Sequence, residues 1–388
     1  MSTGTARLSW AQVCARRLER HALAAPAPGA RPGDIAAVLC GAHAQVLSAA
    51  ELSIGLRIAG ATRGDVRRAL WEERSLVKTC GSRGTVHLLA TRDLPLWTGA
   101  LAAVPRPPSP FPAHVRLTPE QTEQIVAAIA VALADAELTV DELTEAVVAQ
   151  AGSWAGDLVM PAFQGMWPRW RQALTVAAHR GVLCFGPNRG RKVTYTHPRR
   201  WLPGFAPAGE RAALAWLVRG YLYAYGPATS RHFAQWLAAP PRWAADVFDS
   251  LGDELARVEV AGTFAWQAAD ETEPPATAGG GVRLLPYFDA YTVGCHPREL
   301  LFPGRATERA RAPSGQAGNF PVLLVDGAVA GVWHQRRSGR RLDLTVEPFT
   351  PLSAARRRDL DVEVERLGFI LDGSPALTIG PVTVGGHA

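Results

Sequence analysis

Apolar residues recur along much of the chain at helical spacing, and several such runs begin at a polar residue typical of a helix start. The clearest start is Thr118–Gln121, where Thr caps the first turn, Pro suits the first helical position and Gln can bond back to the cap. Behind it, the i, i+3, i+4, i+7, i+8 spacing of one helix face is kept by Ile125, Ala128, Ile129, Ala132 and Leu133. Comparable starts predict further helices from Ser9, Thr62, Thr139 and Ser353.

Three other stretches show β-branched or aromatic residues on both sides of a turn that contains glycine, which is the pattern of a β-hairpin. They span Leu76–Leu89, Gly181–His197 and Leu255–Gln267. Each follows two or three helical segments, and a helical cluster that ends in a β-hairpin is the plan of a winged helix-turn-helix. We therefore predict three tandem winged helix-turn-helix units.

Two connectors divide the chain. Val104–Ala113 is rich in proline and is expected to be extended, whereas Asp270–Gly281 combines proline and glycine after an acidic start. Beyond the second connector, most of the pattern is that of strands (VRLLPYFDAYTVG, FPVLLVDGAVAGVWHQ and RRLDLTVEPF), with a tight-turn signal at Asp326-Gly327. The expected fold class is α+β, with an N-terminal helix and first winged unit in residues 1–104, a second unit in 114–204, a third in 205–270 and a C-terminal β-rich domain in 282–388.

Composition and length agree with a folded protein of several domains. The chain has 388 residues, of which 47% are hydrophobic, so it can bury a sizeable core and is too apolar to be disordered. No charge-free apolar run of about 18 residues predicts a membrane span, and the N-terminus lacks the apolar stretch of a secretory signal. We expect a cytoplasmic or nucleoid-associated protein, and a monomer, because no coiled-coil heptad is present.

Cysteine and histidine spacing does not favour a metal site. The five cysteines form no C-x-x-C pair, and the ten histidines form no H-x-x-x-H. Neither a disulfide framework nor a zinc ribbon matches these spacings. We therefore expect no structural metal and no cofactor.

Charge is distributed unevenly. The chain holds 41 Lys+Arg against 35 Asp+Glu, and all of these bases except Lys78 and Lys192 are arginine. A high-GC genome accounts for an arginine excess, and so does a polyanionic partner, because guanidinium matches phosphate in a two-pronged geometry. Residues 117–168 contain no Lys or Arg but hold eight acids, which are expected to face away from such a partner.

Basic residues gather on two predicted hairpins. Six lie within residues 180–200 and four arginines lie within 331–341, and neither stretch contains an acid. Solvation alone explains one basic tip, whereas several together favour phosphate contacts, and a two-stranded ribbon can enter a duplex groove. In a tandem array, some wings must pack internally. The predicted contacts to double-stranded DNA are Arg336, Arg337, Arg340 and Arg341, with Lys78, Arg83, Arg189, Arg191 and Lys192 as wing candidates.

Four stretches, Gly41–Arg57, Thr62–Leu89, Leu285–Tyr291 and Val325–Phe349, carry a resemblance that extends over nearly the whole chain. Together they resemble the AlkZ-type DNA glycosylases, a winged-helix family that includes the YcaQ-like crosslink glycosylases. The resemblance implies a concave DNA-binding surface and excision of bulky N-alkylated purines. It also implies that some relatives unhook interstrand crosslinks and that some protect producers of genotoxic natural products.

The catalytic signature of that family, Gln-x-Gln or Gln-x-Asp, falls on His43-Ala44-Gln45. Gln45 matches the second position, whereas His43 departs from the first Gln. The resemblance therefore implies that His43 and Gln45 form the active centre. Residues two apart share one side of an extended segment but not a helix face, so a joint role requires extended backbone or a helix end.

The chemistry of the expected lesion suits these side chains. Guanine alkylated at N7 is cationic and leaves as a neutral base, so little acid catalysis is needed. The transition state resembles an oxocarbenium ion, and the protein must hold a water near the anomeric carbon. An amide oxygen can accept a hydrogen bond from that water, and histidine can act as a general base. Protonated His43 would repel the developing cation, so activity should fall at acid pH, and a flat rate from pH 5 to 8 would count against this role.

Three further residues are candidates for the lining of the site. Asp289 either lines it or caps a turn, and the cap is favoured. Trp333 and His334 lie on the basic hairpin, where they either wedge into a groove or pack beneath it. Two other functional classes remain open, namely a non-catalytic winged-helix DNA-binding regulator and a homologue that sequesters a genotoxin or its adduct without excision.

Overall fold

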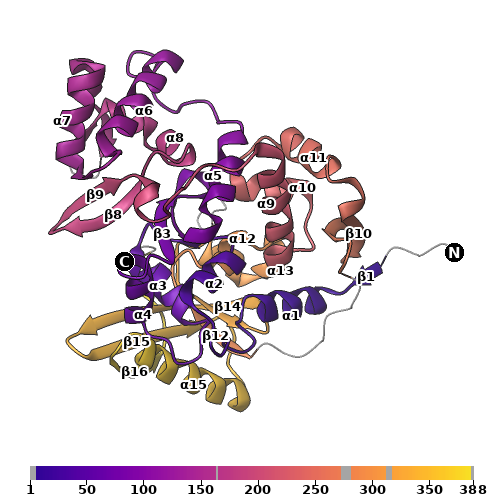
Figure 1. The fold of residues 1–388 in the computed structure, drawn as a ribbon. Helices are drawn as coiled ribbons and strands as arrows, with labels where there is room; N and C mark the ends of the chain where they lie inside the picture. Colours follow the sequence, from indigo (N-terminus) through magenta and orange to yellow (C-terminus); the bar gives the residue numbers. More distant parts are fainter. Residues whose placement is uncertain (1–5, 163–164, 272–280, 312–316, 386–388) are drawn as a thin grey trace.

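The computed structural model describes residues 6–162, 165–271, 281–311 and 317–385 (Figure 1). Helices and short hairpins form the first two thirds of the chain, and a five-stranded sheet dominates the last third. Within these ranges, no helix is long and apolar enough to cross a membrane. The mixed α+β class is confirmed. The division into three winged-helix units, with the bounds given above, stays a prediction.

The N-terminal segment surrounds a small sheet of order β2-β4-β3. The predicted capping boxes at Ser9 and Thr62 are present and begin α1 and α4. The first predicted hairpin is also present, as β3 and β4. The elements are β1 (Ala6–Leu8), α1 (Trp10–Arg20), α2 (Pro32–Val38), β2 (Ala42–His43), α3 (Leu47–Gly55), α4 (Arg63–Trp71), β3 (Leu76–Cys80), β4 (Val86–Ala90) and α5 (Leu94–Ala103).

The middle segment stands apart at the upper left of Figure 1 and has a hydrophobic core largely of its own. The predicted helix starts at Thr118 and Thr139 and the predicted second hairpin are all present. A further hairpin, β6–β7, was not predicted. The elements are α6 (Pro119–Leu133), β5 (Glu137–Thr139), α7 (Val140–Ala151), β6 (Leu158–Ala162), β7 (Gly165–Pro168), α8 (Leu174–His179), β8 (Cys184–Arg189) and β9 (Lys192–Thr196).

The third segment contains α9 (Glu210–Tyr225), α10 (Ser230–Leu237), α11 (Pro241–Asp249) and the third predicted hairpin, β10 (Leu255–Val260) with β11 (Thr263–Ala268). Its residues share one large core with the N-terminal segment and the C-terminal sheet. The Pro-rich connector at residues 104–113 holds no helix or strand, as expected. Most of the second connector, residues 272–280, lies outside the described residues.

The C-terminal segment is a sheet of order β12-β13-β14-β15-β16 covered by one long helix, α15. Two features differ from the prediction. The FDAYTVG stretch is not a strand, because Asp289 caps a short helix there, and β16 pairs with β15 in parallel without having been predicted. The elements are β12 (Val282–Leu285), α12 (Ala290–Gly294), α13 (Arg298–Leu301), α14 (Arg305–Ala310), β13 (Val322–Val325), β14 (Ala328–Ser338), β15 (Arg341–Pro348), α15 (Ala354–Ile370) and β16 (Ser374–Ile379).

Candidate active site and DNA-contact surface

The His43-Ala44-Gln45 motif begins with the last residue of β2 and leads toward α3. His43 pairs with His87 of β4, and the Ala44 amide donates to the Val86 carbonyl at 2.7 Å, so strand pairing continues past β2. Ala44 is buried, His43 is half-buried and Gln45 is exposed. This alternation places His43 and Gln45 on the same, outward side, which is the geometry that a joint role requires.

The His43 ring is held between two aromatic neighbours. Its centroid lies 4.6 Å from that of Phe288 and 5.2 Å from that of His87. Nδ1 is buried and has no hydrogen-bond partner among the described residues. Burial and, secondarily, the positive charge of Arg83 lower the pKa of His43 to about 4. The imidazole is therefore neutral at physiological pH, and Nε2 is the ring atom left to meet a water or a ligand.

This shifted pKa corrects the expected pH dependence. A free histidine would lose its proton near pH 6.5, which led to the expectation of a falling rate between pH 5 and 8. Because the protein disfavours the charged ring, the fall is now expected near pH 4. A flat rate from pH 5 to 8 is thus compatible with His43 as an acceptor.

His87 packs edge to face against the His43 ring and was not identified from the sequence. Its Nδ1 lies 2.8 Å from the Thr85 carbonyl, which can only accept, so Nδ1 carries the proton. The Ser82 hydroxyl lies 3.4 Å from Nε2 and can donate to it. Burial holds the pKa of His87 well below its ordinary value. A Cβ at Gly81 would come within 2.8 Å of this ring, so glycine there gives it room.

Phe288 contacts the His43 ring, and its neighbour Asp289 is bound to residues of the segment that follows His43. Phe288 adopts a left-handed conformation with φ of 51°, which is rare for an aromatic residue, and its amide donates to the Gly318 carbonyl. The buried Asp289 carboxylate accepts from both Nη atoms of Arg57, at 2.7 and 2.9 Å, and from the Ser53 hydroxyl at 2.7 Å. Since Ser53 and Arg57 follow the His43-Ala44-Gln45 motif on and just after α3, this ion pair joins α12 to the segment that follows the motif.

Asp289 is therefore a structural residue in this fold. Burial alone would raise the pKa of its carboxyl, but Arg57 and the hydrogen bonds hold it below its ordinary value. The Tyr291 amide also donates to it, which is the predicted cap. At 1% exposure, the carboxylate is closed to a ligand, so of the two alternatives for Asp289 the structure shows the favoured one, the cap, and not the lining of the site. The FDAY motif could have pointed to Phe288 instead.

The first predicted wing, β3–β4, is packed inside the molecule. Arg83 lies in the turn Ser82–Gly84, and its Nη1 donates to the Trp236 carbonyl at 2.8 Å. Lys78 is half-buried, with Nζ 5.0 Å from the centre of the Phe185 ring. Burial lowers the pKa of both groups. Arg83 and Lys78 thus join this hairpin to α10 and to the middle segment, which is the internal packing expected of some wings in a tandem array. Their contact with DNA stays a prediction.

The second wing, β8–β9, is exposed but partly neutralised. Arg189 pairs with Glu142 at 3.1 Å, and Lys192 pairs with Asp141 at 2.7 Å. Both acids belong to the acid-only stretch, so α7 lies against this wing. That the stretch faces away from DNA stays a prediction. Arg191 is exposed and has no ion pair within the part of the chain that the structure describes.

The hairpin β14–β15 carries its arginines on an exposed tip. Arg340 pairs with Asp372 at 3.3 Å, Arg341 pairs with Asp343 at 2.7 Å, and Arg337 donates to the Leu371 and Asp372 carbonyls. Arg336 has no ion pair among the described residues.

Both hairpin residues that were considered as wedges are at least partly buried. Trp333 is buried and donates from Nε1 to the Leu285 carbonyl at 2.9 Å, so it packs beneath the sheet and cannot wedge into a groove. His334 is half-buried at the start of the exposed part of β14.

Comparison with known proteins places this geometry in a family. Residues 36–369 match the sequence model of the DNA glycosylase AlkZ-like family. The chain is 35% identical over 347 residues to an interstrand DNA cross-link repair glycosylase of Streptomyces sahachiroi, an alignment that covers 84% of this chain and 88% of that protein. The solved structure of the Streptomyces sahachiroi DNA glycosylase AlkZ matches with a TM-score of 0.81 and 30% identity, over 96% of this chain and 100% of that one. This chain belongs to the DNA glycosylase AlkZ-like family.

Proposed function

We propose that this protein is a monofunctional DNA glycosylase that hydrolyses the N-glycosidic bond of bulky N7-alkylated purines, including interstrand crosslinks or natural-product adducts. The observation that carries the proposal is the neutral His43 ring, held by two aromatic neighbours on the same side of an extended segment as the exposed Gln45. Such an enzyme serves base excision repair or self-resistance to a genotoxin.

The proposed reaction needs positioning more than acid catalysis. As the bond from C1′ to the purine breaks, its electrons neutralise the cationic base, which leaves without protonation. A water held by His43 and the Gln45 amide oxygen forms the new bond to C1′ and gives its proton to the imidazole, which returns it to solvent. A neutral ring suits this role, because it does not repel the positive charge developing on the sugar.

The proposed substrate is double-stranded DNA bound by one copy of the chain. In Figure 1 the hairpins β8–β9 and β14–β15 point the same way, with α3 and α4 between them. Exposed Arg191 and Arg336 at these hairpins are free to exchange water for phosphate. The surface between them is our candidate for the concave DNA-binding face.

An abasic-site assay tests this proposal. The full chain is incubated with a duplex carrying one defined bulky N7-alkylguanine, and strand cleavage at the resulting abasic site is measured under single-turnover conditions. We expect base release by the wild type and a loss of about 100-fold or more in His43→Ala and Gln45→Ala. Release that survives both substitutions would move the active centre elsewhere.

A second candidate function is favoured by one residue, since His43 stands where the family signature has Gln. In that case the protein binds the lesion without excising it. Two results together would support this function and overturn the first. The wild type would bind DNA tightly in a lesion-dependent way, and it would produce no abasic sites from any bulky adduct.

A further inference from the structure

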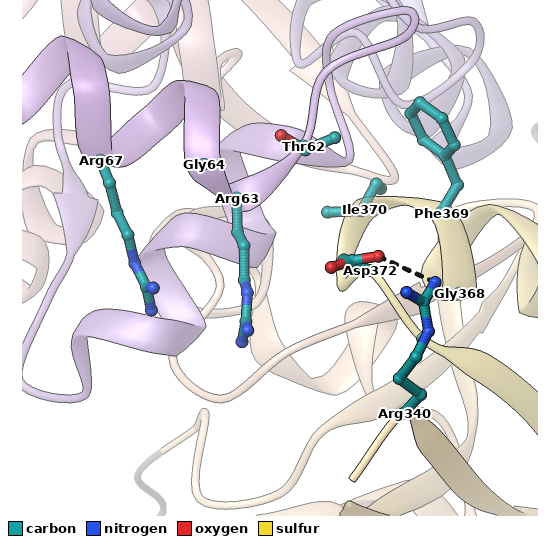
Figure 2. Close-up of a pocket in the computed structure, with 10 residues that line it drawn as sticks. Thr62, Arg63, Gly64, Arg67, Arg340, Gly368, Phe369, Ile370 and Asp372 are labelled. Atoms are coloured by element: carbon teal, nitrogen blue, oxygen red, sulfur yellow. Dashed lines mark hydrogen bonds and ion pairs between the residues drawn. The ribbon is translucent and has the colours of Figure 1, made fainter.

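A pocket of about 480 Å³ lies between the start of α4, the end of α15 and the turn of the β14–β15 hairpin (Figure 2). Three arginines from two distant parts of the chain line it, namely Arg63, Arg67 and Arg340. In Figure 2, Arg63 and Arg67 extend side by side from α4, as expected for positions four residues apart on a helix. Two of the stretches that carry the family resemblance, Thr62–Leu89 and Val325–Phe349, supply these arginines, but the residues of the His43-Ala44-Gln45 motif do not line the pocket.

The three guanidinium groups differ in how firmly they are held. Arg67 binds both oxygens of the buried Glu51 carboxylate, at 2.6 and 2.9 Å, yet its side chain stays 49% exposed. Among the described residues, the Arg340 side chain forms one ion pair, a solvent-exposed pair with Asp372 at 3.3 Å, which is an interaction of small net stability. Arg63 has no hydrogen bond or ion pair from its side chain within the described ranges. The pocket therefore offers one fixed cation, one exchangeable cation and one without a partner.

The pocket is close to the catalytic motif through α3. Glu51, which holds Arg67, lies on α3, and that helix begins at Leu47, two residues after Gln45. Arginines beside this helix match the phosphates of the strand that enters the active site.

We infer that this pocket is a phosphate-binding site, in which Arg63, Arg67 and Arg340 hold the backbone of the DNA strand that enters the active site. The inference rests on the proposed function for its DNA partner. Guanidinium groups bind phosphate oxygens through charge-assisted, two-pronged hydrogen bonds, and Arg340 would exchange its exposed pair with Asp372 for such a contact. Asp372 then opposes binding, because its carboxylate faces the same pocket.

This arrangement predicts opposite effects from two substitutions that the fold should tolerate. Arg63→Glu replaces an unpartnered cation in the first helical turn by an acid, which a helix N-terminus prefers, so α4 should remain folded. Asp372→Asn removes the opposing charge at a position with φ of 51°, a conformation that Asn accepts readily. Arg242→Glu is the matched control, since Arg242 is exposed in the first turn of α11, away from α4 in Figure 1.

The experiment measures equilibrium binding of the full chain to a duplex with a central tetrahydrofuran abasic analogue, at several salt concentrations. We expect Arg63→Glu to weaken binding by about tenfold at 0.1 M salt and to lower the slope of log K against log salt by about 1. Asp372→Asn should tighten binding severalfold. Arg242→Glu, with the same change in net charge, should leave both quantities close to those of the wild type.

The outcomes separate this site from the proposed activity. Affinities of Arg63→Glu and Asp372→Asn equal to that of the control would overturn the phosphate site, even if the wild type releases bases. Opposite shifts in a protein that releases no base would support the site and remove the glycosylase. A wild type that binds no duplex would overturn both.

Discussion

The hairpins β3–β4 and β14–β15 both carry arginine near the turn, yet they occupy opposite environments. In the first, the Arg83 guanidinium donates to the Trp236 carbonyl and burial lowers its pKa. In the second, Arg336 is exposed and has no ion pair within the described part of the chain. A basic residue at a hairpin tip is therefore no guide to its role until the packing around the tip is known.

We call β3–β4 the closed hairpin and β14–β15 the open hairpin, and the two differ in what their residues contact. Because β3–β4 is clamped between α10 and the middle segment, His87 on β4 is fixed in one tautomer and supports the His43 ring. An open wing could not hold a ring so firmly. The open hairpin keeps water on its arginines, which is the state from which a phosphate contact forms. We therefore expect the first hairpin to act on catalysis and the second on DNA binding.

The largest effect is expected from the buried Arg57–Asp289 ion pair, which joins α12 to the end of α3. Asp289→Asn leaves the buried Arg57 charge without a counter-ion, and removal of one partner from a buried pair costs about 3–5 kcal/mol. Urea unfolding of the variant should show this loss in the free energy of unfolding. Arg341→Gln, which breaks an exposed pair with Asp343, is the control and should cost less than about 1 kcal/mol. Similar losses in the two variants would contradict a structural role for Asp289.

Substitution of Phe288 should have a smaller effect, and the quantity that it changes is the excision rate. Phe288→Ala removes one of the two rings that hold His43, so we expect the single-turnover excision rate to drop by about 10–100-fold. Phe288→Tyr keeps the ring and should retain most of the wild-type excision rate. Affinity for the abasic-analogue duplex should stay within about twofold in both variants. A rate loss that Tyr does not restore would show that the aromatic contact is not what positions His43.

Much of the local structure could be predicted from the sequence, because the signals are local. The capping boxes at Ser9, Thr62, Thr118 and Thr139 each begin a helix where expected, and the three glycine-turn hairpins are all present. These features depend on residues within a few positions of one another, so a single sequence contains the information.

The environment of the site could not be predicted, because it depends on contacts between distant segments. His87 lies 44 positions from His43 and meets it only through strand register, and Phe288 reaches the same ring from the C-terminal segment. The burial of Arg83 and Trp333 likewise depends on what packs over each hairpin. Residue type and local pattern are the same for a buried tip and an exposed one.

The contrast between the hairpins can be tested on single charges. Arg336→Met removes one exposed cation from the open hairpin, and Lys78→Met removes one cation packed over Phe185 in the closed hairpin. We expect Arg336→Met to lower the slope of log K against log salt by about 1 and to weaken duplex binding about threefold to tenfold. Lys78→Met should change neither quantity. Equal slopes for the two variants would remove the distinction between a binding hairpin and a catalytic one.

The smallest effect is expected from the one charge of the closed hairpin that His43 senses. Arg83→Met keeps most of the side-chain volume and removes a positive charge that helps to lower the pKa of His43. Since burial is the larger cause and remains, that pKa should rise from about 4 but stay below 6.5. The excision rate, flat at higher pH because the ring is neutral there, should begin to fall at a higher pH than in the wild type. Single-turnover rates between pH 4 and 8 measure this midpoint, with Arg336→Met as the control that loses a charge elsewhere. Identical midpoints in all three proteins would mean that the charge of Arg83 is not felt at the His43 ring, and that the closed hairpin acts on catalysis through packing alone.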